Sequence, residues 1–65
     1  MLVAIGSLVT INVDFELTSK IKISKGDYAI VIGYPTEDSS SIFDYLAVCN
    51  GVEVYLFKYE IELVN

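Results

Sequence analysis

Apolar and polar residues alternate along the first third of the chain with a period of two. Between Val9 and Leu17 the odd positions are apolar and the even positions are polar, namely Thr10, Asn12, Asp14 and Glu16. A period of two places successive side chains on opposite faces of a strand, whereas a helix would repeat every 3.6 residues. The pattern predicts a half-buried antiparallel strand with one solvated face.

The apolar residues remain on odd positions through Ile21 and Ile23, and this pattern allows two interpretations. Either one long strand bends, or a loop opens at 18–20 and its isoleucines fold back onto the core. A strand from Val9 to Ile23 would exceed the usual length of about 3–10 residues. We therefore favour a loop over residues 14–24.

The next segments predict a turn, a central strand and a second loop. Gly26 tolerates positive φ and predicts a turn over residues 25–27. Residues 28–34 are apolar on both faces, which indicates a central strand or a barrel strand whose outer face is also used. Pro35 has no backbone donor and ends that strand, and residues 36–41 form a polar loop tip.

Asn50-Gly51 separates two apolar runs, 42–49 and 52–57. Because both turn residues tolerate positive φ, this dipeptide predicts a hairpin with a type I′ turn. Residues 58–60 then predict a single 3₁₀ turn, and residues 61–64 a closing strand.

These elements predict one all-β domain over residues 1–65, built from five short strands that close into a small bent barrel with a short 3₁₀ turn before the last strand. Closure would remove the exposed sheet edges that so small a sheet otherwise leaves. A chain of this length buries only about 60% of its unfolded surface, so we expect marginal stability.

The pattern resembles the SH3-like barrels, and among them a class of small uncharacterised phage and cyanobacterial proteins. The matching segments are Gly6 to Ile11, Lys25-Gly26-Asp27, Ile30 to Ile32, Tyr45 to Val48, Asn50-Gly51 and Glu60 to Val64. The ending is also similar to that of the SH3-like stromal subunit of photosystem I. The resemblance implies a five-stranded SH3-like barrel that is phage-encoded, and it implies nothing about chemistry because turn and core residues carry it. Proline-peptide binding is not implied, since the chain has no Trp.

The charge balance disfavours nucleic acid as a partner. Nine acidic residues against four lysines give a net charge of −5, and the chain has no Arg. Lys20, Lys22 and Lys25 form a local basic patch, but backbone binding requires many positive charges. We expect these lysines to be solvated, and we keep a nucleic-acid-binding barrel as a rival hypothesis in which they contact phosphates.

The residue types favour neither catalysis nor a cofactor or metal site. The chain has no His, and its serine run at 39–41 has no base beside it. The single Cys49 excludes an internal disulfide and is expected to be a small buried hydrophobe. The start of the chain does not resemble a signal peptide, and the longest apolar run is too short for a membrane helix. These features predict a cytoplasmic, non-enzymatic protein, in the host cytoplasm if it is phage-encoded.

Aromatic content is the remaining functional signal. The chain is 54% hydrophobic and has five tyrosines, too many large rings for the interior of so small a barrel. The candidate protein-binding residues are Tyr28, Tyr34, Tyr55, Phe57 and Tyr59. These rings form either a protein contact rimmed by acid or a satellite core under the first loop and the tail. We predict a non-catalytic protein-protein interaction module, with a homo-oligomeric structural or virion accessory protein as a second rival.

Overall fold

The computed structural model describes residues 3–35 and 42–64, which form short strands and one described 3₁₀ turn. The elements in chain order are β1 (Leu8–Ile11), β2 (Phe15–Glu16), β3 (Lys22–Ile23), β4 (Tyr28–Gly33), β5 (Tyr45–Cys49), β6 (Val52–Leu56), η2 (Lys58–Glu60) and β7 (Ile61–Leu63). The predicted all-β class is confirmed. The predicted loop tip at 36–41 lies outside the described residues. In the described ranges no helix is long and apolar enough to cross a membrane.

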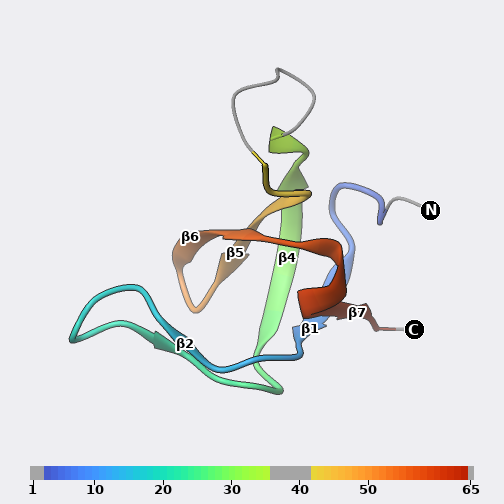
Figure 1. Cartoon of the computed structure of the whole chain (residues 1–65). Helices are drawn as coiled ribbons and strands as arrows, with labels where there is room; N and C mark the ends of the chain where they lie inside the picture. The colour runs from blue at the N-terminus through green and yellow to red at the C-terminus, as the bar shows by residue number, and fades with distance from the viewer. Residues whose placement is uncertain (1–2, 36–41, 65) are drawn as a thin grey trace.

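Five strands form one antiparallel sheet in the order β6-β5-β4-β1-β7. The central strand is β4, as the apolar run at 28–34 predicts. Strands β2 and β3 form a separate two-stranded ladder that extends to one side of the main sheet (Figure 1). The hairpin that contains them connects β1 to β4.

The sheet does not close into a barrel, so the predicted closed barrel is corrected. The end strands are β6 and β7, which are not hydrogen-bonded to each other in the described sheet. The connection between them is η2, which is only one turn long, so the bent sheet brings its two end strands near each other without a hydrogen-bonded ladder between them (Figure 1). A hairpin at this position would instead have paired the two strands side by side.

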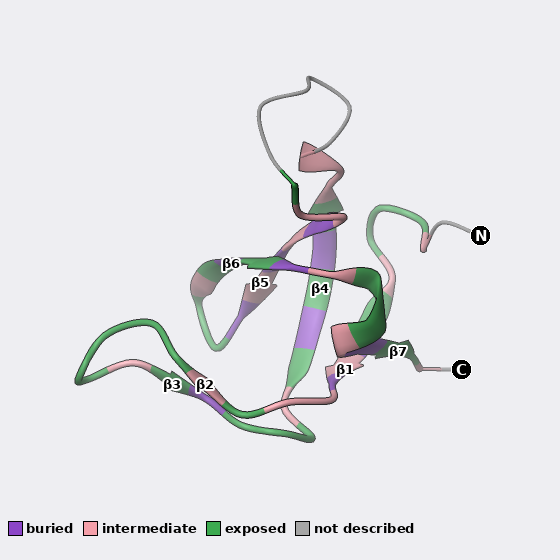
Figure 2. Cartoon of the chain, viewed as in Figure 1, coloured by how far each residue is buried: buried purple, intermediate pink, exposed green. Residues whose placement is uncertain are grey.

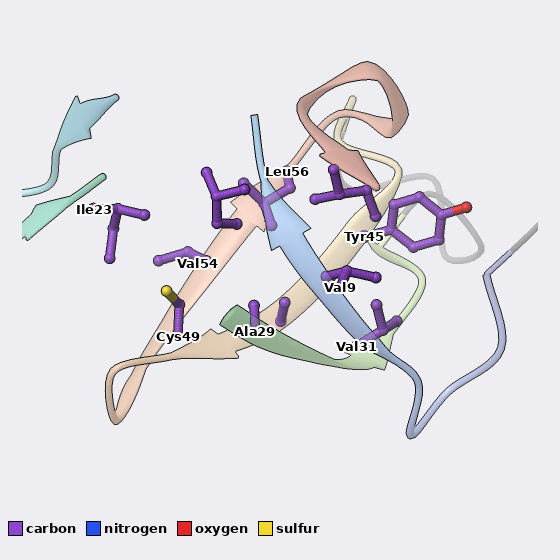
Figure 3. Close-up of a cluster of buried hydrophobic side chains, with 11 residues drawn as sticks. Val9, Ile23, Ala29, Val31, Tyr45, Cys49, Val54 and Leu56 are labelled. Atoms are coloured by element: carbon purple, nitrogen blue, oxygen red, sulfur yellow. The ribbon is translucent and has the colours of Figure 1, made fainter. Parts of the chain in front are cut away.

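The core lies against one face of the main sheet. Strand β4 alternates along its length, with Ala29 and Val31 buried and Tyr28, Ile30 and Ile32 exposed (Figure 2). The full buried cluster is Val9, Ile11, Ile23, Ala29, Val31, Tyr45, Ala47, Cys49, Val54, Leu56 and Ile61. Figure 3 shows the ring of Tyr45 at one end of this cluster and Ile23 at the other. Tight packing of such side chains is the main source of stability in a domain this small.

The predicted turns are confirmed. Asn50 has φ 53° and Gly51 has φ 79°, the pair of positive values that a type I′ turn requires. Gly26 has φ 95°, in the turn before β4. The 3₁₀ turn spans residues 58–60, as predicted.

Residues 14–24 differ from the predicted loop, because they contain the ladder between β2 and β3. Ile23 folds back onto the core and is 1% exposed, as the loop interpretation requires. The odd positions between β1 and Ile23 are buried less fully than the pattern predicts, since Phe15 and Ile21 are only half-buried and Leu17 is exposed. Strand β1 ends at Ile11, and beyond it Val13 and Phe15 pack only partly against the core.

Candidate functional site

The structure separates the candidate aromatic residues into three places. Tyr28 is 60% exposed on the outer face of β4, and Tyr34 is half-buried just after that strand. Tyr55, Phe57 and Tyr59 lie together on β6 and η2. The five residues therefore do not form one patch.

Tyr34 belongs to an internal contact with the first described residue. Its hydroxyl donates a hydrogen bond to the carbonyl oxygen of Val3 at 2.6 Å, and the Val3 N–H donates to the hydroxyl oxygen of Tyr45 at 2.9 Å. The two tyrosine rings lie 6.0 Å apart between centroids. These contacts hold the start of the chain against the end of β4, and they leave little of Tyr34 for a partner.

A row of four aromatic rings covers the surface at β6 and η2. Phe43 contacts Tyr55 at 5.7 Å and Phe57 at 4.6 Å between ring centroids. Phe57 in turn stacks on Tyr59 at 5.5 Å with an interplanar angle of 7°. Tyr55 and Tyr59 remain 53% and 70% exposed. The row is therefore both a packed cluster, as the satellite-core interpretation requires, and an exposed aromatic surface.

A groove of about 360 Å³ opens beside this row. One wall is the β2–β3 hairpin and the other is β6 with η2. Its lining residues are Phe15, Leu17, Phe43, Tyr55, Phe57 and Glu60. A site of this size, with an apolar lining and one charged group, has the composition of a binding pocket for side chains of a ligand.

Two carboxylates fix the backbone at the end of the groove. Glu60 accepts a hydrogen bond from the N–H of Phe57 at 2.8 Å, and Asp44 accepts one from the N–H of Lys58 at 2.8 Å. Because these carboxylates bind backbone donors at η2, they hold Phe57 in position against Phe43. They also leave an acidic rim, which would favour a partner with amide donors or a positive charge at that end.

The three candidate lysines do not form a free basic surface. Lys20 and Lys25 are exposed in the turns that flank β3. Lys22 lies 3.7 Å from Glu16 across the hairpin, and both side chains are more than half exposed. Lys22 also lines a second hollow of about 280 Å³ together with Asp14 and Glu16. These neighbouring carboxylates reduce the positive potential that phosphate binding requires.

Cys49 is fully buried in the core, as predicted. Burial, and to a smaller extent the negative charge of Asp27, raises the pKa of the Cys49 thiol. A raised pKa disfavours the thiolate, which is the reactive form of cysteine. In the part of the chain that the structure describes, no three acidic or cysteine side chains gather in an arrangement that could hold a metal ion.

Four groove residues are missing from the sequence-based candidates, namely Phe15, Leu17, Phe43 and Glu60. The odd positions of the first two predict the core face of a strand. The apolar run at 42–49 predicts a strand that includes Phe43, although β5 begins only at Tyr45. No local sequence pattern predicts that these residues come together, because the groove joins three segments that are distant in sequence. The adjacency of Phe43 to the acidic loop is the one feature that indicates a surface position.

Comparisons of the chain with protein-family models, with curated proteins and with solved structures give no match. The resemblance to small SH3-like phage proteins is thus neither supported nor opposed by a relative.

Proposed function

We propose that this protein is a small non-catalytic protein-binding module and that the aromatic groove is its binding site. The observation that carries the proposal is the lining of the groove, where five apolar side chains from three chain segments converge at the surface. Aromatic residues at the centre of an interface supply contact area at low entropic cost, and they are enriched in residues that dominate binding energy.

We further propose that the architecture is of the SH3-like type, with phage as the source. The strand order, the β2–β3 hairpin between β1 and β4, and the 3₁₀ turn between β6 and β7 support the architectural part. The phage origin rests only on the motifs around Lys25-Gly26-Asp27, Asn50-Gly51 and the tail.

The groove predicts that the chain selects short linear peptides. The protein would be used to select binders from a random peptide library, and the affinity of the best peptides would be measured by fluorescence anisotropy. Substitutions on opposite walls, Leu17→Ser and Tyr55→Ala, are each expected to weaken binding about tenfold, since each removes a large contact from the centre of the site.

The matched control is Tyr28→Ala, because Tyr28 is exposed to a similar extent as Tyr55 (60% and 53%) but lies on β4 outside the groove. It should bind the selected peptides as the unmodified protein does. Selected peptides that tolerate both wall substitutions, in proteins whose circular dichroism is unchanged, would refute the groove as the site. Binding that disappears at moderate salt and requires Lys20, Lys22 and Lys25 would instead favour the nucleic-acid-type electrostatic mode.

A further inference from the structure

A second apolar surface lies on the face of the main sheet that points away from the core. On β4 it contains Tyr28, Ile30 and Ile32, which are 60%, 39% and 39% exposed, and β1 adds Leu8 at 38%. These four side chains together expose on the order of 300 Å² of largely apolar surface, if a tyrosine presents about 200 Å² when fully exposed. That is the size of the largest patch on a typical monomer, and such patches often bind partners.

The strand register makes this surface continuous. Ile30 is paired with Leu8 on one side and with Val48 on the other, so these three residues form a row across β1, β4 and β5. Adjacent strands lie about 4.8 Å apart, so the row is about 10 Å wide. That width matches the diameter of an α-helix, which is about 10 Å.

Acidic residues mark both margins of the apolar surface. On one side, Val48 in the row of Ile30 is paired with Glu53 on β6. On the other side, Tyr28 is paired with Thr10 on β1, and Thr10 is paired with Glu62 on β7. Glu53 and Glu62 are both exposed. Neither forms an ion pair in the described part of the chain, where the salt bridge found is between Glu16 and Lys22. The surface is therefore an apolar strip with a negative charge on each side.

These charges decide against a second copy of the chain as the occupant. In a two-fold dimer with these faces in contact and the strands of the two copies aligned, β6 would lie over either β6 or β7 of the other copy. Either arrangement brings a glutamate near a glutamate, in a protein whose net charge is already −5. Like charges at an interface margin oppose association, whereas lysine or arginine at those positions would stabilise it.

We propose that the outer face of the sheet binds an amphipathic helix whose apolar stripe covers β4 and whose lysine or arginine side chains reach Glu53 and Glu62. Such a helix buries its stripe over the row of Ile30, and its long basic side chains extend past β1 and β5 to the acidic margins. The surface adjoins the aromatic groove at β6, where Glu53 and Tyr55 lie on the same face of the strand, but its apolar residues on β4 and β1 are not part of the groove lining.

The test uses a synthetic peptide of about 18 residues, with a leucine stripe and lysines on both flanks, long enough to form a helix. A matched peptide keeps the leucines and replaces the lysines with glutamates. The lysine peptide is expected to bind at least about tenfold more tightly than the glutamate peptide. The substitution pair Tyr28→Thr with Ile30→Thr places β-branched residues in the strand and should weaken binding of the lysine peptide about tenfold.

Two further variants test whether the peptide binds at the outer face and its acidic margins or at the groove. The pair Glu53→Gln with Glu62→Gln should reduce the preference for the lysine peptide and flatten its salt dependence. Tyr59→Ala removes a tyrosine that is 70% exposed and stacks on Phe57 beside the groove, and it should leave binding of the lysine peptide unchanged. The proposal is overturned if the lysine peptide shows no preference over the glutamate peptide, or if it binds the Tyr28→Thr, Ile30→Thr protein as tightly as the unmodified one. A dimer in light scattering that this pair of substitutions abolishes would assign the face to a second copy instead.

Discussion

At the scale of single residues, five tyrosines of the same chemistry have different roles because their surroundings differ. Tyr45 is 2% exposed and accepts a hydrogen bond from the N–H of Val3. Tyr34 is half-buried and donates to the carbonyl oxygen of the same residue. Tyr28, Tyr55 and Tyr59 keep more than half of their surface exposed. Composition alone predicts that some rings lie outside the core, but only the contacts show which ones.

The hydroxyl of Tyr45 predicts a measurable contribution to stability. Tyr45→Phe removes the hydroxyl oxygen that accepts the hydrogen bond from the Val3 N–H and leaves this part-buried donor without that acceptor. The free energy of unfolding should therefore fall by about 1 kcal/mol. Urea unfolding measures this difference. Tyr59→Phe is the control, because its hydroxyl belongs to an exposed ring and its removal should change the value by less than about 0.5 kcal/mol. Equal effects of the two substitutions would contradict the role assigned to Tyr45.

Cys49 predicts a pH dependence of stability. Its pKa is raised above 9.0 in the folded protein, first by burial and then by Asp27. Above that pH the unfolded chain releases the thiol proton while the folded protein keeps it, so the unfolded state is favoured as pH rises. The contribution of the Cys49 thiol to the free energy of unfolding is fully present below the pKa that the thiol has in the unfolded chain. It is lost as pH rises through the pKa that the thiol has in the folded protein.

The measurement compares the unmodified protein with Cys49→Ala, because the two proteins differ only at the side chain that carries the thiol. The free energy of unfolding of the unmodified protein should fall relative to Cys49→Ala between about pH 8 and pH 10. A difference between the two proteins that stays constant over this range would show that the thiol has an ordinary pKa in the folded state.

At the scale of elements, the β5–β6 hairpin depends on backbone conformation more than on space. A Cβ at Gly51 would meet no atom within 4 Å, but φ is 79° there. Gly51→Ala should therefore cost about 1–2 kcal/mol through strain alone. Gly33→Ala is the matched control, since its φ is not positive and the new Cβ would lie 3.8 Å from the Cβ of Leu46. Thermal unfolding compares the two, and an equal loss of stability in both would contradict the type I′ assignment.

The sequence predicts well those elements that are determined by a few adjacent residues. The Asn50-Gly51 turn, the end of β4 before Pro35 and the 3₁₀ turn at 58–60 each follow from a few adjacent residues. The β2–β3 ladder escapes prediction, because it is only two residues long on each side and its parity matches that of β1. The prediction of closure is wrong, because the hydrophobic pattern determines which face of a strand is buried and not which strands are paired at the edges of the sheet.

The groove is also only partly predictable, because it is formed by contacts between segments that are distant in sequence. Two of the candidate protein-binding residues, Tyr55 and Phe57, do line the groove. The opposite wall, Phe15 and Leu17, is formed by a hairpin that returns from β1, and a contact between distant segments leaves no periodic signal. A prediction from local pattern therefore recovers one wall of the site and misses the other.

At the scale of the whole molecule, residues 3–35 and 42–64 form a small sheet with a buried face, and among them two exposed apolar surfaces stand out. Its core contains eleven buried hydrophobic residues among those described. The aromatic groove lies at the hairpin side, and the outer face of β4 with its acidic margins lies on the reverse of the sheet from the core. The exposure of so much apolar surface by a chain of 65 residues is understandable if those surfaces contact other proteins.

Amide chemical shifts of the ¹⁵N-labelled protein, followed on titration with a peptide selected from the library, test most directly whether the aromatic groove binds peptides. We expect the largest changes at Leu17, Phe43, Tyr55 and Phe57, while the amides of Lys20 to Lys25 change little. Failure to select any binding peptide, or changes confined to residues outside both walls of the groove, would contradict the proposal that the groove binds peptides.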